Sequence, residues 1–412
     1  MELFPLQLFP GGGFDKSIVP VIYIGLVVLW FFAETYGFVF IGLVVPGYLA
    51  AVEVIAPASA AVVFLESLVT YAIVWGLSDG IGKRGVWSPF FGRDRFFAFL
   101  VVSVVVRLVG GLWLWPTAWQ YVSTALGIAA SPPGPLSSLG LVLVPLTANM
   151  FWKIGVLRGS WQILLPSTIT WAFTTYILLP YTNLRFSEFR LNFEDVAVDF
   201  LSSSRTYIVL LVAAALSARL NKRYGWDFGG ILVPALLAVT WYTPDKALIT
   251  FAEVLLLAGA ASLIVSAPVI KNWNLEGPRR LILVFTVAFL FKWALSWVVV
   301  AVAPSVQMTD FFGFGYLLSS LLALKILQKD FASTVLPAFA VSLAGFLAGS
   351  SVALGIQLTR LTAISPARVE SGATASIDAR PALPTLVERT ALLRPRGGDR
   401  RPISNTQLRH LE

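Results

Sequence analysis

The stretch Gly42-Leu43-Val44-Val45-Pro46-Gly47-Tyr48-Leu49-Ala50 is largely apolar but is interrupted by one proline and two glycines. A related stretch returns at Gly230-Ile231-Leu232-Val233-Pro234-Ala235-Leu236-Leu237-Ala238. Proline removes a backbone donor from a helix, so an interrupted segment at membrane depth is tolerated only where protein or water satisfies the freed groups. Recurrence of such segments in two halves of a chain indicates a binding or conduction site.

The composition predicts an all-α integral membrane protein. Of 412 residues, 57% are hydrophobic and 13% charged, and the mean hydropathy is +0.79, which a water-covered domain could not sustain. There is no cysteine, and the only histidine is His410. Disulfides, thiolate zinc sites, cysteine nucleophiles and buried histidine centres are therefore excluded. Gly11-Gly12-Gly13 is not followed by the Lys-Ser/Thr of a phosphate loop, so we expect no nucleotide site, metal or other cofactor.

Hydrophobic patterning predicts ten to twelve transmembrane or re-entrant helices. The first apolar run is followed by Glu34 rather than by a small-residue cleavage site, which favours a retained span over a signal peptide. Stretches near 38, 138, 227 and 312 fall short of the roughly 20 residues that a crossing needs, so we expect half-helices, tilted spans or re-entrant hairpins there. The twelve stretches are 18–33, 38–52, 54–76, 95–115, 138–152, 156–180, 205–219, 227–241, 247–270, 279–303, 312–327 and 332–357.

The two halves align as a tandem duplication with a repeat of about 185 residues. The matched positions keep one order and a slowly drifting offset. They are Gly37, Gly42 and Pro46 with Gly225, Gly230 and Pro234; Pro57 and Glu66 with Pro244 and Glu253; Arg95 and Arg107 with Arg280 and Lys292; and Gly140 with Gly315. The predicted organisation is an N-terminal extension (1–17), a first repeat (18–180), an acidic polar linker (181–204), a second repeat (205–358) and a disordered basic tail (359–412).

Each repeat is a candidate for an inner inverted repeat of three plus three crossings. Gly140-Leu141-Val142-Leu143-Val144-Pro145 resembles the segment from Gly42 to Pro46, and three crossings per group would invert the second group. Twelve crossings then place five basic clusters on the cytoplasmic side and the acidic linker outside, although both termini also fall outside. The clusters contain Lys83, Arg84, Arg93 and Arg95; Lys153 and Arg158; Lys222 and Arg223; Lys271, Arg279 and Arg280; and Lys325 and Lys329.

Ionisable residues within the apolar stretches are the first candidate site residues. Glu34 ends the first run, where its carboxylate could bind a cation or a substrate ammonium group, or simply mark the membrane boundary. Glu66 and Glu253 lie at mid-span in matched segments. They are candidates for substrate binding or proton transfer, and the structural alternative is an interior ion pair with Arg107 or Lys292.

Helix ends and basic loops supply the remaining candidates. Pro46-Gly47 and Pro145 are interpreted as openings of helices whose free N–H groups would bind an anion, with a packing kink as the alternative. Helix starts on the basic face could dock an acidic partner or serve only as topology signals. For binding or translocation these considerations add Gly42 and Pro234, and for docking they give Arg93, Arg95, Arg279 and Arg280.

The pattern Glu34-x-x-Gly37-x4-Gly42-Leu-Val-Val-Pro46-Gly47-Tyr48-Leu49-Ala50, followed by a basic loop and Gly140-x4-Pro145-x3-Asn149, resembles the PgsC/CapC family of poly-gamma-glutamate synthase membrane subunits. The resemblance covers about residues 18–180, and 205–357 is similar to a diverged second copy. That copy has Ala235 after its proline and Ser320 in place of Pro145, and it lacks the acidic residue. The resemblance adds Asn149 of the second motif to the candidate residues for substrate binding or translocation.

The resemblance implies a non-catalytic subunit of the bacterial cytoplasmic membrane that helps to make and export an anionic glutamate polymer. Its implied partners are a cytoplasmic ATP-dependent amide ligase of the Mur-ligase type and a further membrane-anchored capsule subunit. Two other readings stay open. One is a free-standing secondary transporter of a small anion that uses Glu66 and Glu253 for proton coupling, and the other is a membrane transferase, for which no nucleophile or metal constellation is visible.

Overall fold

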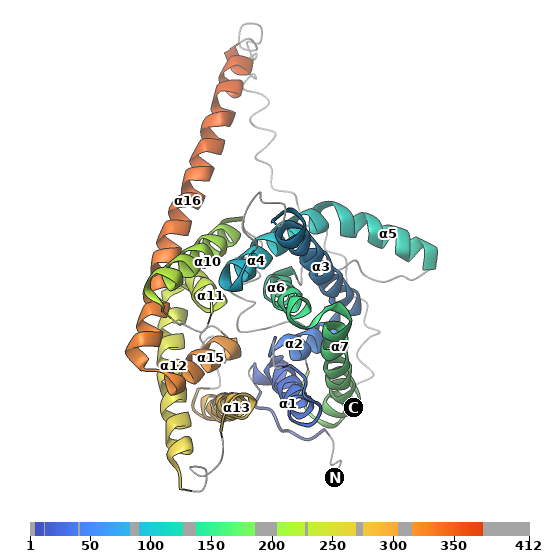
Figure 1. The fold of residues 1–412 in the computed structure, drawn as a ribbon, viewed down its shortest axis with the longest axis vertical. Coiled ribbons are helices and arrows are strands. Elements are labelled where there is room, and N and C mark those ends of the chain that lie inside the picture. Colours follow the sequence, from blue (N-terminus) through green and yellow to red (C-terminus); the bar gives the residue numbers. More distant parts are fainter. Residues whose placement is uncertain are drawn as a thin grey trace, which may run out of the picture. The chain divides into compact units, whose positions relative to one another are not determined.

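The computed structural model describes residues 5–11, 13–39, 42–82, 90–126, 137–185, 204–226, 230–268, 275–303 and 315–373 (Figure 1). Within these ranges the chain is helical, apart from one isolated bridge between Leu6 and Thr182. The helices are η1 (Phe14–Lys16), α1 (Val19–Tyr36), α2 (Val45–Ile55), α3 (Pro57–Trp75), η2 (Gly76–Ile81), α4 (Gly92–Val109), η4 (Gly110–Leu114), α5 (Trp115–Leu126), α6 (Ser137–Ile154), α7 (Val156–Phe173), η5 (Thr174–Leu178), α8 (Leu179–Tyr181), α10 (Ser204–Tyr224), α11 (Leu232–Thr240), α12 (Pro244–Ser266), α13 (Pro278–Val302), α15 (Gly315–Gln328) and α16 (Phe331–Ala373).

The helices confirm the predicted all-α, multi-pass membrane architecture. Among the described residues, six helical segments are long and apolar enough to cross a membrane: Val19–Tyr36, Pro57–Gly80, Val156–Tyr181, Pro244–Ser266, Pro278–Val302 and Phe331–Thr359. Three of the four predicted short segments are short: α2 has 11 residues, α11 has 9 and α15 has 14, whereas the segment near 138 lies in α6, which has 18. The fold therefore combines candidate membrane-spanning helices with helices too short to cross alone.

Several helices begin at or next to a proline, but Pro145 lies inside its helix. Pro46 lies at the first turn of α2, where its missing N–H costs no hydrogen bond. Pro57, Pro244 and Pro278 open α3, α12 and α13 in the same way. Pro145 instead lies inside α6, so the expectation of a helix N-terminus there is wrong. A helix continues through such a proline when its neighbours satisfy the freed carbonyl.

The backbone repeats the conformations of the first half in the second half. Gly37 and Gly225, which end α1 and α10, have φ values of 65° and 66°. Gly92 and Gly277, beside the starts of α4 and α13, have φ values of 54° and 53°. Only glycine adopts this region readily. Contacts repeat too, since α1 packs on α2 as α10 packs on α11, and α3 packs on α6 as α12 packs on α15. The fold is therefore compatible with the predicted duplication.

The two repeats share one apolar core. The main cluster of buried side chains includes Ile22 and Val144 of the first repeat and Phe285 and Leu322 of the second. Across the repeats, α1 packs against α13 and α10 packs against α4 (Figure 1). Residues Met1–Gly355 accordingly form one compact body.

The rest of the chain, Ile356–Glu412, is a separate unit. Helix α16 continues to Ala373, beyond residue 358, where the second repeat was predicted to end. Residues 374–412 lie outside the described ranges. So do residues of the predicted basic clusters (Lys83, Arg84 and Lys271), of the acidic linker (Glu188, Glu194, Asp195 and Asp199) and of the basic tail (Arg394, Arg396, Arg400, Arg401 and Arg409).

Candidate functional site

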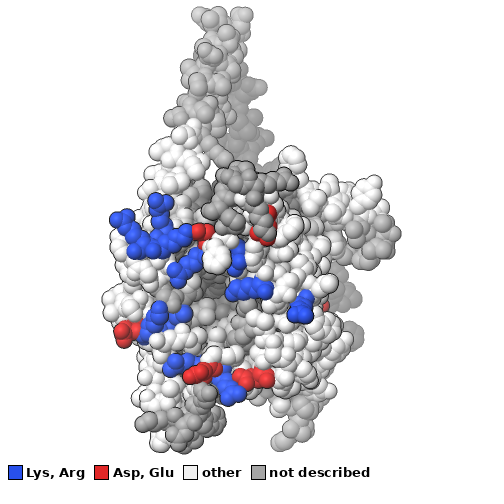
Figure 2. Space-filling view, viewed as in Figure 1, with Lys and Arg blue, Asp and Glu red and all other residues white. Residues whose placement is uncertain are grey.

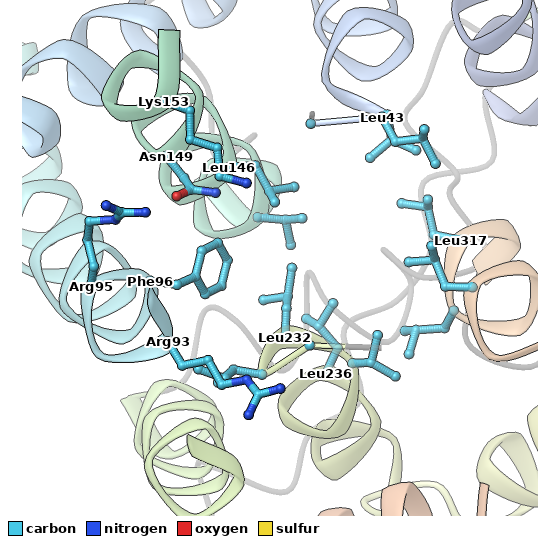
Figure 3. Close-up of a pocket in the computed structure, with 18 of the residues that line it drawn as sticks. Leu43, Arg93, Arg95, Phe96, Leu146, Asn149, Lys153, Leu232, Leu236 and Leu317 are labelled. Carbon is cyan, nitrogen blue, oxygen red and sulfur yellow. The ribbon is translucent and has the colours of Figure 1, made fainter. Parts of the chain in front are cut away.

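A pocket of about 540 Å³ lies where the interrupted segments of the two repeats meet (Figure 3). Gly42 from the segment before α2 and Gly230 from the segment before α11 both line it. Both glycines have positive φ, 70° and 105°, so these turns depend on the absence of a side chain. The other lining residues are Leu43, Val44, Gly92, Arg93, Arg95, Phe96, Val142, Leu146, Asn149, Lys153, Ile231, Leu232, Val233, Leu236, Leu317, Leu318 and Leu321.

All the polar side chains that line the pocket come from the first repeat, which also contributes apolar ones. Arg93 and Arg95 come from the start of α4, and Asn149 and Lys153 lie one turn apart on α6. Figure 3 shows Arg95, Asn149 and Lys153 together, with Leu43 and Leu317 across the open space. The second repeat contributes one glycine and apolar residues from α11, α15 and the segment before α11. No carboxylate occurs among the described lining residues, so the three cations favour an anionic occupant.

One lining cation, Arg95, is held by a side chain of a different helix. The Arg95 guanidinium lies over the Trp152 ring, 5.1 Å from its centroid, a cation–π contact that links α4 to α6. Asn149 and Lys153 differ by four residues and so share one face of α6. The sequence reading named Asn149 but used Lys153 only as a topology marker, and it missed Phe96. The spacing of four residues was the available signal for Lys153.

Four of the sequence-predicted site residues line the pocket: Gly42, Arg93, Arg95 and Asn149. Glu34 does not, because its carboxylate is bound by Arg279, which donates from Nε and Nη2 at 2.9–3.2 Å. Arg280, the other docking candidate on α13, also lies outside the pocket lining. The remaining candidates lie elsewhere in the helices: Pro46, Gly47, Glu66, Arg107, Pro145, Pro234, Glu253 and Lys292.

Glu66 of α3 forms a buried ion pair with Arg107 of α4. Arg107 Nη1 donates to Glu66 Oε2 at 2.8 Å, and the two side chains are 12% and 1% exposed. Trp115 Nε1 donates to the other carboxylate oxygen at 2.8 Å. A Cβ atom on Gly110 would lie 2.5 Å from that indole nitrogen, so a glycine is needed for the tryptophan to reach Glu66. The π-helix η4 lies between Arg107 and Trp115 in the chain. Single π-helical turns of this kind occur frequently at functional sites.

Glu253 of α12 forms the matching pair with Lys292 of α13. Lys292 Nζ lies 2.5 Å from Glu253 Oε1, and the side chains are 1% and 6% exposed. Ser319 Oγ of α15 donates to the same oxygen at 3.1 Å. The structural alternative predicted from the sequence, one interior ion pair per repeat, therefore describes both Glu66 and Glu253. Because each carboxylate is bound to a cation, neither is placed as a free proton carrier.

Replacing Trp115 with phenylalanine is expected to weaken the fold by about 1.5–3 kcal/mol, the usual value of a hydrogen bond to a charged group. The carboxylate of Glu66 would keep Arg107 but lose its second donor. Heat unfolding in detergent would measure the loss. Trp113→Phe is the matched control, because Trp113 is 77% exposed and lies only two residues earlier, in the π-helix η4. Equal melting temperatures for the two variants would contradict the role given to Trp115.

The described residues contain no group of three or more His, Cys, Asp or Glu side chains that could hold a metal ion. The site is therefore built from cations, one amide, glycines and apolar side chains.

Comparison with known proteins gives one family. The model of the family described as Capsule biosynthesis CapC matches residues 24–160 and 212–335. A curated relative, "PGA biosynthesis protein CapC" of Bacillus subtilis (strain 168), is 30% identical over 168 residues, which cover 40% of this chain and 99% of the relative. No solved structure matches. The relative is thus as long as one repeat, and the two matched segments agree with the predicted duplication. The chain belongs to the CapC family of capsule biosynthesis proteins, as a multi-pass membrane protein.

Proposed function

We propose that this chain is the membrane subunit of a complex that makes and exports poly-gamma-glutamate, and that its pocket holds the polymer during passage. The CapC relative is named for PGA biosynthesis, which supports the biosynthetic role. The observation that carries the pocket assignment is its lining of three cations without a carboxylate among the described residues. Poly-gamma-glutamate bears one carboxylate on every residue, so it is the kind of polyanion that such a lining attracts.

The asymmetry of the pocket fits a moving polymer better than a tightly held ligand. Cations on one wall would bind successive carboxylates, while the leucine-rich wall of the second repeat offers no hydrogen bond that must be broken for release. Conduction requires sites that are favourable enough to enter and weak enough to leave. Gly42 and Gly230 add no side chain to the pocket, and the other lining residues of both interrupted segments are apolar.

The ligase and the membrane-anchored subunit are proposed to dock on the basic face. Figure 2 shows Lys and Arg side chains gathered over one face of the molecule, with fewer Asp and Glu among them. A basic surface next to the pocket would steer an acidic partner and could deliver a growing polyanion to the opening. Arg93 lines the pocket and Arg279 is bound to Glu34, so docking is proposed to depend on the other basic residues of this face.

The test is the double substitution Arg93→Gln with Lys153→Gln in the cell that makes the polymer. It removes two of the three pocket cations, so surface polymer is expected to fall at least about tenfold, since charge-assisted hydrogen bonds contribute about 1.5–3 kcal/mol each. Membrane abundance of the protein and co-purification of the ligase should remain. Arg158→Gln is the control, because Arg158 is an exposed basic residue near Lys153 that does not line the pocket.

Each outcome of this experiment has a defined meaning. Normal polymer in the double variant would refute the pocket as the polymer site. Loss of ligase co-purification together with polymer would assign the two cations to docking instead. Proton-coupled uptake of a small anion by the purified chain in vesicles would favour the secondary transporter, although the bound states of Glu66 and Glu253 speak against it.

A further inference from the structure

Two exposed ion pairs join the first repeat to the second. Glu34, near the end of α1, accepts hydrogen bonds from Arg279 at the start of α13. Lys222, near the end of α10, pairs with Asp94 at the start of α4. In both cases one partner belongs to each repeat. The pairs therefore sit at the two places where helices of different repeats pack, α1 on α13 and α10 on α4.

The two ion pairs occupy equivalent positions with opposite polarity. Glu34 and Lys222 each lie three residues before the positive-φ glycine that ends α1 or α10. Asp94 and Arg279 each lie two residues after the positive-φ glycine that precedes the basic helix start. The first repeat thus has an acidic residue at both positions and the second repeat has a basic residue at both.

From this arrangement we propose that the exchanged charges direct the first repeat to pair with the second and discourage pairing between like repeats of two chains. A pair of first repeats would bring Glu34 of one chain against Asp94 of the other, twice. A pair of second repeats would bring Lys222 against Arg279, twice. Only the mixed pair places opposite charges together at both positions.

The charges act on the choice of partner more than on the strength of the contact. All four side chains are at least 26% exposed, and exposed ion pairs add little stability. Like charges in the same positions are unfavourable, so the difference between the mixed pair and the like pairs is larger than either bridge alone. Two identical one-repeat chains could not carry this exchange, because both copies would have the same residue at each position. The inference does not depend on what the pocket binds.

The test exchanges the charges without changing composition or net charge. Glu34→Lys with Lys222→Glu makes both intrachain contacts repulsive and makes each repeat complementary to its own kind. Adding Asp94→Arg and Arg279→Asp makes the intrachain contacts attractive again. Each full-length version would be co-expressed as two differently tagged copies, purified in detergent through one tag and probed for the other. Heat unfolding of the same samples gives the stability.

The double exchange is expected to raise co-purification of the second tag at least about fivefold over the natural sequence and to lower the melting temperature. The fourfold exchange should bring co-purification and the melting temperature most of the way back to those of the natural sequence. Such a rescue would also show that the double variant did not merely misfold. Unchanged co-purification in the double variant would overturn the proposal. A fourfold variant no better than the double would also overturn it, because the residues would then act singly and not as pairs.

Discussion

Replacing Lys292 with methionine is expected to destabilise the protein by about 3–5 kcal/mol, the cost of leaving one partner of a buried ion pair alone. Lys292 and Glu253 are 1% and 6% exposed, so water cannot take the place of the lost ammonium group. Ser319 would remain as a donor to one carboxylate oxygen. The other oxygen, Oε2, has no hydrogen-bond partner among the described residues even in the intact protein. Heat unfolding in detergent and the yield of folded protein measure the effect.

The double variant Glu253→Gln with Lys292→Met is the decisive comparison. It removes both charges while keeping a carbonyl that can accept the Ser319 hydrogen bond, so it should recover most of the lost stability. Recovery would show that the penalty comes from an uncompensated charge. A double variant as unstable as Lys292→Met would mean that the penalty does not come from the unpaired charge on Glu253.

The interior ion pairs show what sequence can predict here. Glu66, Arg107, Glu253 and Lys292 stood at matched positions in apolar stretches, and the cost of isolated charge in a membrane made pairing a natural alternative. The additional hydrogen-bond donors to the two carboxylates, Trp115 and Ser319, could not be predicted, because they do not occupy equivalent positions in the two repeats. Periodicity identifies the residues that must be paired, but not every group that reaches them.

The contacts between the two repeats could not be predicted from the sequence either. Glu34 lies 245 residues from Arg279, and the sequence reading placed the two in different roles, one as a substrate ligand and one in partner docking. Their relation appears only when α1 is seen to pack against α13. The one-sided polarity of the pocket depends likewise on which faces of α4, α6, α11 and α15 point inward. Helix packing decides which faces point inward. In lipid the sequence pattern does not reveal this packing, because the faces turned to lipid and the faces turned to other helices are both apolar.

Replacing Gly47 with alanine is expected to cost about 1–3 kcal/mol, the usual penalty for overpacking a filled interface. A Cβ atom there would lie 2.7 Å from the Cα and 2.9 Å from the carbonyl oxygen of Ile22, which are backbone atoms of α1 that cannot rotate away. Gly25 faces Gly47 at the same crossing. Gly259→Ala in α12 is the matched control, since its Cβ meets nothing within 4 Å and alanine is the better helix former. Equal stability of the two variants in heat unfolding would contradict this account.

The same substitution separates the packing role of the interrupted segment from its role at the pocket. Gly42 and Val44 line the pocket directly before α2 begins, whereas Gly47 faces α1. Pushing α2 away from α1 should therefore move the pocket wall without changing any pocket side chain. Gly47→Ala should lower surface polymer in step with folded protein if the segment only packs helices. A loss of polymer per folded molecule would instead show that the close crossing sets the shape of the pocket. The matched positions of the second repeat hold Ala213 and Ala235, so the glycine pair that this substitution tests belongs to the first repeat alone.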